Sequence, residues 1–242
     1  MDMDHEAENR KIVRNRALIS VLLIYISIYV LQFVVYFLIL FLASGFLALS
    51  GKSSADVAGK IQDTEYRRFL MECYSLVLSF VFILWCGWLY KKSDWRFRPD
   101  YHKVFGKKHL FQIFSVGFCG CFFVIFIMTV LQNIFPAFFQ GYIDRMAEFN
   151  TGTVRVYLYS LLFGPVAEEF VFRGAIFDRL YLVFPFWLAN LIQAVLFAVY
   201  HGDVIQGTYA FLFGLLLGMV HYTGKSIWNN ILTHILFNTT NY

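Results

Sequence analysis

Glu168 and Glu169 stand side by side in an otherwise apolar stretch of the chain, and Arg173 follows four residues after Glu169. Even mild scales assign a cost of about 2.5–3.5 kcal/mol to an acidic or basic group at the middle of a membrane. Glu169 and Arg173 have the i, i+4 order that favours an ion pair on a helix. Glu168 then points elsewhere, and an unpaired carboxylate in apolar surroundings is suited to act as a general base.

Two further pairs of residues have a helical spacing and carry groups that hydrolysis could use. Phe197 and His201 are four residues apart, and so are His234 and Asn238. A carboxylate and an imidazole can hold and activate a water, while imidazole and amide groups can donate to a developing oxyanion. The set therefore fits hydrolysis of an amide bond by an activated water.

The elements that must position these groups are membrane helices. Of the 242 residues 59% are hydrophobic and 15% are charged, whereas a soluble domain has about 25% charged residues. Uncharged runs approach or exceed the ~20 residues that cross a bilayer at 17–51, 73–90, 110–143, 180–200 and 204–220, with shorter runs at 153–167 and 226–242. The sequence predicts an all-α, polytopic membrane helix bundle of about seven transmembrane helices, in a range of about six to eight.

The polar groups of interest are confined to the second part of this single membrane domain. We predict that residues 1–152 form N-terminal helices without recognised motifs and that residues 153–242 form the catalytic core. Localisation in the cell membrane, as a multi-pass protein, follows from the apolar runs.

Pro185 divides the core into the two arms of a predicted helical hairpin, because proline interrupts a helix. Glu168 precedes Pro185 by about as many residues as His201 follows it. At about 1.5 Å per residue, both groups would lie ~24 Å from the apex. We therefore expect Glu168 and His201 to face each other at one depth.

Three local features complete the expectations for the core. The Gly164–Pro165 pair is expected to break or kink the helix just before the acidic pair. Gly214 and Gly218 are spaced to permit close helix packing. His221 has no partner at a matching position, so we predict that it lies at the membrane interface.

The basic residues predict the orientation of the bundle. Segment 10–16 and loop 91–109 carry many of the 20 lysines and arginines. With seven helices the positive-inside rule places the N-terminus in the cytoplasm and the C-terminus outside. Anionic lipid headgroups are the expected partner of the basic residues, and we expect no nucleic-acid binding.

The combination of spacings resembles the motifs of the CAAX-protease and bacteriocin-processing family of intramembrane proteases. The residues that carry the resemblance are Glu168-Glu169-x-x-x-Arg173, Phe197-x-x-x-His201 and His234-x-x-x-Asn238. The resemblance covers about residues 163–238, and the first 150 residues carry none of it.

The resemblance implies a role for each residue of the site. Glu168 and His201 would activate the water. His234 and Asn238 would stabilise the oxyanion, and Arg173 would order the acidic pair. The short, Phe-rich chain is more similar to bacterial members, which implies a peptide or protein substrate such as a bacteriocin or signalling precursor, and a bacterial plasma membrane.

Each motif also has a purely structural interpretation. Glu169 and Arg173 can be a buried ion pair that fixes helix packing. His201 can be an interfacial histidine near a helix end. His234 and Asn238 can be interhelical hydrogen-bonding groups.

Other functions remain open beside a protease that needs no cofactor. His201, His234 and a glutamate could hold zinc in a metalloprotease, since three such ligands and a water make a catalytic zinc site. A non-enzymatic immunity or regulatory protein could use the same fold to bind a partner. A transporter with a buried proton relay would also need such groups, but no inverted repeat is evident. The sequence leaves the oligomeric state open.

Overall fold

The computed structural model describes residues 2–92, 106–149 and 152–241. All regular secondary structure in these ranges is helical, which confirms the all-α membrane bundle. The N-terminal elements are α1 (Asp2–Leu49), α2 (Ser54–Gln62), α3 (Thr64–Lys92), α4 (Lys107–Phe114), the π-helical η2 (Ser115–Cys119), α5 (Gly120–Ile134) and α6 (Pro136–Phe149). The C-terminal elements are α7 (Val154–Tyr157), η3 (Leu158–Phe163), α8 (Gly164–Glu168), η4 (Glu169–Phe177), α9 (Asp178–Tyr181), α10 (Phe186–Tyr200), α11 (Val204–Gly224) and α12 (Ile227–Asn241).

Four helical stretches are long and apolar enough to cross a membrane in the part of the chain that the structure describes. They comprise residues 11–49, 64–90, 107–134 and 204–224, and α10 is a shorter apolar helix. Two predicted spans need correction. The run 110–143 is divided at Pro136, where α6 begins, and the run 180–200 is divided by the turn before α10. Residues 93–105 of the basic loop lie outside the described residues.

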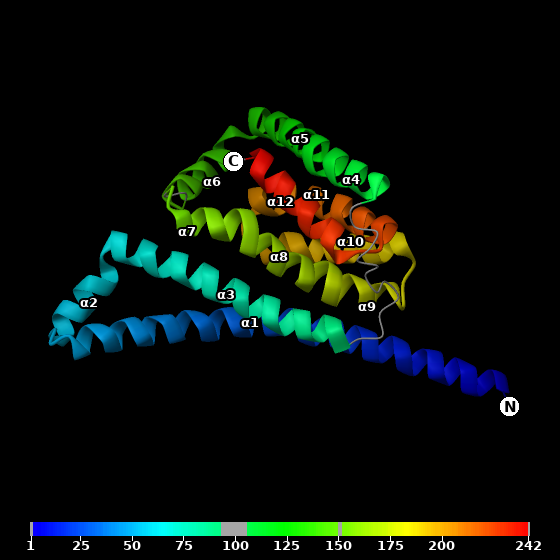
Figure 1. The fold of residues 1–242 in the computed structure, drawn as a ribbon, viewed down its shortest axis with the longest axis horizontal. Coiled ribbons are helices and arrows are strands. Elements are labelled where there is room, and N and C mark those ends of the chain that lie inside the picture. The colour runs from blue at the N-terminus through cyan, green and yellow to red at the C-terminus, as the bar shows by residue number, and fades with distance from the viewer. Residues whose placement is uncertain (1, 93–105, 150–151, 242) are drawn as a thin grey trace.

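Helices α1 and α3 form one layer of the molecule. The amphipathic α2 joins them at one tip, and the remaining helices pack on one side of this layer (Figure 1). The core between the layers is apolar and includes Ile28, Phe82, Cys86, Phe172 and Phe177. Burial of such side chains holds a soluble core together, and here their close packing fixes the α1–α3 layer against the helix that carries the acidic pair.

The helix that carries the acidic pair runs without a break from Val154 to Tyr181. The expected break at Gly164–Pro165 is wrong, because the chain widens into the π-helical η3 instead of kinking. A Cβ atom on Gly164 would lie 2.8 Å from the carbonyl oxygen of Tyr159. Glycine therefore permits the close approach that this wide turn requires. Stretches of π-helix are rare in proteins, and those that occur are often found at functional sites.

The helical hairpin about Pro185 is confirmed. Pro185 is the N-cap of α10, and the turn before it reverses the chain. Helix α11 then packs closely on α10, as its glycines predicted: a Cβ atom on Gly214 would lie 3.3 Å from the Cα of Ala194, and one on Gly218 would overlap the side chain of Asn190.

Candidate active site

A cavity of about 530 Å³ opens between α6, the helix Val154–Tyr181 and α10–α12. Glu168, His201, His234 and Asn238 all line it. These four residues come from three segments of the chain, because His234 and Asn238 share α12, and six aromatic side chains form part of the remaining wall. Glu168 and His201, from the two arms of the hairpin, both line this cavity, and their facing each other stays a prediction.

Glu169 and Arg173 form a fully buried ion pair below this cavity. One guanidinium nitrogen lies 3.0 Å from Glu169 Oε1, and both side chains have 0% exposed surface. Arg173 also donates to the carbonyl oxygen of Gly214 at 3.4 Å, and its guanidinium lies 4.5 Å from the centre of the Phe197 ring. These contacts fix the guanidinium from three helices.

His234 lies between the two glutamates. Its Nδ1 is 2.7 Å from Glu169 Oε1, and its Nε2 is 3.7 Å from Glu168 Oε2. Because Glu169 is held as a carboxylate by Arg173, it accepts a hydrogen bond and His234 Nδ1 donates. The sequence suggested Glu169 only as a partner of Arg173, so this second role in orienting His234 was missed.

His201 is oriented by the helix on which it lies. Its Nδ1 lies 2.8 Å from the carbonyl oxygen of Phe197. A carbonyl oxygen can only accept, so Nδ1 carries the hydrogen and Nε2 of the neutral ring has a free lone pair. The Phe197 ring meets the imidazole edge to face, with 4.7 Å between ring centres. The spacing of four residues thus sets the tautomer of His201.

Asn238 is held by the wide turn of η3. Its amide nitrogen donates to the carbonyl oxygen of Ser160 at 2.8 Å. An amide nitrogen carries two hydrogens, so this bond fixes the side chain and leaves one hydrogen for another acceptor in the cavity.

Comparison with known proteins adds a second line of evidence for this region. Residues 150–240 match the family model described as "Type II CAAX prenyl endopeptidase Rce1-like". This region is therefore similar to the CAAX-protease family over residues 150–240.

One similar protein carries a name that agrees with this family. It is the "Putative membrane peptidase YdiL" of Bacillus subtilis (strain 168), which is 33% identical over 82 residues, or 34% of each chain. The match thus spans about a third of that relative's length. No solved structure matches the chain.

Residues from outside the family match complete the cavity. Tyr142, Met146 and Ala147 of α6 form part of its wall. Sequence reasoning assigned no function to the first 152 residues and so missed them. One sequence feature could have indicated them: Tyr142 and Met146 are four residues apart, and so lie on one face of an amphipathic stretch that begins at Pro136.

The prediction for His221 is wrong. His221 is fully buried, and its Nε2 lies 2.9 Å from Asp178 Oδ1. Neither residue lines the cavity, and Asp178 lies close to the end of the helix Val154–Tyr181. Asp178 was the missed partner: it follows the apolar run after Arg173 and is itself an acidic residue inside a helix, which is the signal that could have found it.

An ion pair links α6 to the turn beside His201. Arg145 contacts Asp203, which also caps α11 by accepting from the backbone amides of Ile205 and Gln206. Burial acts to raise the pKa of Asp203, but these amide hydrogen bonds and Arg145 outweigh it and keep the pKa below its usual value. Asp203 is therefore ionised at neutral pH and anchors α6 over the cavity.

The geometry of the described residues holds no group of three histidine, cysteine, aspartate or glutamate side chains close enough to bind a metal ion. His201, His234 and Glu168 nevertheless line a common cavity. The expectation of a site that needs no cofactor stays a prediction.

Proposed function

We propose that the chain is an intramembrane endopeptidase that hydrolyses a peptide bond in a peptide or protein substrate with a Glu/His-activated water. The observation that carries this proposal is the position of His234, hydrogen-bonded to Glu169 and facing Glu168 in a cavity shared with His201 and Asn238. The match of residues 150–240 to a peptidase family supports the same reaction class.

Water activation is assigned to Glu168 and His201. The water donates one hydrogen bond to the free lone pair of His201 Nε2 and gives its other proton to Glu168 as its oxygen attacks the carbonyl carbon. A tetrahedral intermediate forms. Glu168 then returns the proton to the amine nitrogen as the carbon–nitrogen bond breaks. The base is thereby restored, with one water consumed for each bond broken.

Oxyanion stabilisation is assigned to His234 and Asn238. Asn238 has one amide hydrogen beyond the bond to Ser160. His234 uses Nδ1 to contact Glu169, so Nε2 donates when the ring is an imidazolium. The site then has no net charge, because the two negative carboxylates are matched by the positive Arg173 and imidazolium. This neutrality matters because an uncompensated charge is costly inside a protein in a membrane.

Glu169 and Arg173 are positioning residues in this mechanism. Neither lines the cavity, and both are fully buried. Their pair presents one carboxylate oxygen to His234 Nδ1, which fixes the plane of the imidazole. Preorganised donors of this kind stabilise a transition state because they need no reorganisation during the reaction.

The cavity favours an apolar peptide segment as the substrate. Its wall includes Tyr159, Phe197, Tyr209, Phe213 and Phe237. A pocket with an aromatic wall and a few polar groups gains affinity from buried apolar area and orientation from the polar groups. Bacteriocin-like or signalling peptide precursors, which the motif resemblance implies, have suitable membrane-associated segments.

Two alternatives need separate tests. A zinc-dependent form of the same peptidase would use His201, His234 and Glu168 as ligands, and these side chains would have to move closer together, because among the described residues no three such groups are placed to hold a metal ion. A non-enzymatic immunity or regulatory protein would use the cavity to bind a peptide without cleaving it. The tests below separate these alternatives from hydrolysis without a metal.

The proposed activity is tested by co-expression with candidate peptide precursors and mass spectrometry of the products. Wild-type chain should yield two fragments whose masses sum to the precursor plus one water. Glu168→Ala should leave the precursor intact while reaching the membrane in equal amount. Precursor that binds the wild-type chain and is recovered uncut would favour the immunity or regulatory alternative.

A further inference from the structure

The cavity lies at one end of the helix bundle. It is lined by Met146 of α6, the start of the helix Val154–Tyr181, the end of α10, the start of α11 and Asn241 near the end of α12. All these chain ends meet at the same end of the molecule. Figure 1 shows the last turns of α12 beside α6, whereas the start of α1 extends away from them along the long axis.

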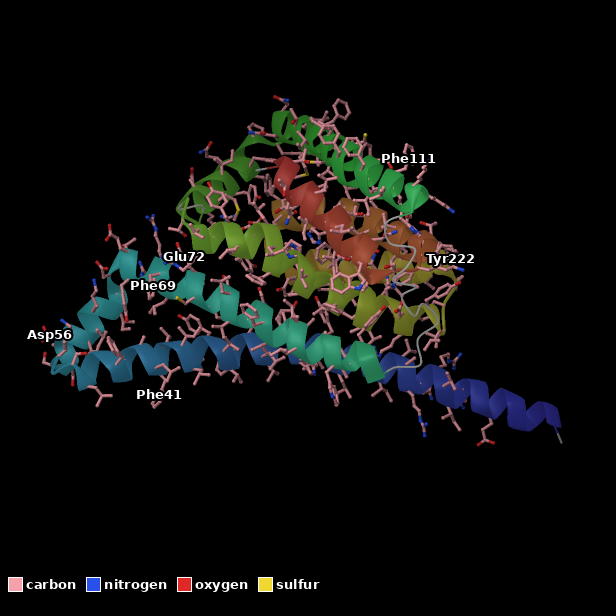
Figure 2. All side chains as sticks on the ribbon, in the orientation of Figure 1. Phe41, Asp56, Phe69, Glu72, Phe111 and Tyr222 are labelled. Carbon is pink, nitrogen blue, oxygen red and sulfur yellow. The ribbon has the colours of Figure 1, made fainter. Side chains whose placement is uncertain are left out.

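Further contacts define this cavity end of the molecule. Arg145 pairs with Asp203 across the cavity rim, and Arg155 lies 2.6 Å from Glu72 near the start of α3. The connection from α1 through α2 to α3 is at the same end. Figure 2 shows Asp56 of α2 and Tyr222 of α11 far apart along the long axis.

The opposite end is defined by a second set of contacts. Arg179 of α9 donates to Ser20 of α1 at 2.8 Å, and Arg16 lies in the same surface groove as Arg179 and Leu89 of α3. Tyr181 packs against Tyr222, close to the turn that contains Lys225. Residues 16–20 of α1, the end of α3, the end of α9 and the α11–α12 turn therefore lie at the same end of the bundle.

The basic residues are unequally divided between the two ends. Of the lysines and arginines in the described ranges, the cavity end carries Lys52, Lys60, Arg67, Arg68, Arg145 and Arg155. Among the described residues, the opposite end carries the basic residues of segment 10–16, Lys91 and Lys92 at the end of α3, Lys107 and Lys108 at the start of α4, and Arg179 and Lys225. Lysines and arginines in short connections are retained on the cytoplasmic side, while acidic residues contribute little to orientation. The end without the cavity is therefore the cytoplasmic end.

We infer that the cavity opens toward the extracytoplasmic face of the membrane. This orientation is argued from the helix ends and the basic residues, and does not depend on whether the site is catalytic. Its consequence for the substrate rests on the proposed function: the bond that is cut belongs to a peptide segment at the outer face, either a secreted peptide or the outer end of a membrane-spanning precursor. A segment exposed only in the cytoplasm would face the basic end and would not reach Glu168.

Single cysteines and a large membrane-impermeant maleimide test this inference in intact cells. Cys73, Cys86, Cys119 and Cys121 are first replaced by alanine. Ala147→Cys then reports on the cavity wall, Ser50→Cys on the α1–α2 connection, and Leu182→Cys on the turn before α10. All three positions are exposed, and none of the changes alters a charge.

The expected result is reaction of Ala147→Cys and Ser50→Cys in intact cells, and reaction of Leu182→Cys only after permeabilisation. The reverse pattern would overturn the inference. If Ala147→Cys is shielded in both conditions, Ser50→Cys and Leu182→Cys still decide the orientation. Each variant must be recovered from the membrane at the level of the cysteine-free parent.

A second readout connects orientation with the reaction. In cells that co-express a cleaved precursor, the impermeant reagent should stop processing by the Ala147→Cys variant and leave processing by the cysteine-free parent unchanged. Continued processing by labelled Ala147→Cys would contradict entry of the substrate through this opening. If the labelling pattern holds but even the unlabelled parent cuts none of the precursors, the proposed function fails while the orientation stands.

Discussion

The α1–α3 layer and the helix Val154–Tyr181 pack against each other but differ in which side chains they bury. The layer exposes large apolar side chains, whereas the helix buries charged ones. On α1, Phe41 is 74% exposed and Leu49 is 91% exposed. Figure 2 shows Phe41 pointing away from the bundle. In η4 every residue except Phe170 is buried, including both members of the Glu169–Arg173 pair. Exposed apolar residues suit a lipid-facing surface, whereas a buried ion pair demands a structural or chemical reason.

This difference predicts at which positions a substitution should change stability or activity. A lipid-facing residue can change to another apolar residue with little effect, because it has few fixed neighbours. A residue around η4 is fixed by contacts from several helices, so its replacement leaves unpaired charges or overlapping atoms. The following experiments compare the two regions.

The largest effect is expected at Glu168. Glu168→Gln should lower the rate of peptide hydrolysis by roughly 10²–10⁴, which is the usual contribution of a general base. Glu169→Gln should lower the rate less and the yield of folded protein more, because Glu169 acts through Arg173 and His234. Product formation by mass spectrometry and membrane yield measure the two effects. Equal activity of Glu168→Gln and wild type would contradict the assignment.

The next effect concerns the buried ion pair. Arg173→Gln leaves Glu169 buried without its cation and should destabilise the protein by about 3–5 kcal/mol. Arg145→Gln is the matched control at the exposed pair with Asp203, where the expected loss is at most about 1 kcal/mol. Thermal unfolding in detergent measures both. Similar losses for the two variants would show that burial of the Glu169–Arg173 pair has no special role.

A smaller effect is expected from helix packing. Gly218→Ala places a methyl group against Asn190 and should cost about 1–3 kcal/mol, as overpacking does. Gly45→Ala on α1 is the control, since nothing lies within 4 Å of its added Cβ atom. The same unfolding assay should find Gly45→Ala at or above wild-type stability. A destabilised Gly45→Ala would mean that the α1–α3 layer is also closely packed against a partner.

The smallest effect is expected from metal removal. Chelator treatment of purified protein should leave peptide hydrolysis unchanged, because Glu168, two histidines and Asn238 already supply a base and oxyanion donors. Metal content is measured before and after treatment. Stoichiometric zinc, with activity lost on its removal and restored on its return, would replace this mechanism by the zinc-dependent one and leave the peptidase assignment intact.

The sequence predicted those features that depend on local spacing and missed those that depend on tertiary packing. The apolar runs predicted the membrane bundle, Pro185 predicted the hairpin, and Glu169–Arg173 predicted an ion pair, because each is decided by neighbouring residues. The contribution of α6 to the cavity, and the partner of His221, depend on which helices meet in space. The motifs did not specify those helix contacts.

The continuous widening at Gly164–Pro165 was missed for a different reason. Proline lacks a backbone donor and ordinarily kinks a helix. Here the preceding residues wind as a π-helix, in which hydrogen bonds join residues five apart,. Sequence patterns describe α-helical periodicity and give little warning of this winding.

The π-helical η3 has a consequence for insertions and deletions in this helix. In an α-helix each residue turns the direction of the side chains by about 100°. Glu168 and Glu169 follow six residues of wider winding, so their directions relative to Ser160 depend on that segment keeping its length. Deletion of one residue between 158 and 163 would restore ordinary winding and rotate the acidic pair away from His201 and His234, although every motif residue would remain in the chain. Homologous chains can therefore contain all three motifs and still differ in whether those motifs converge.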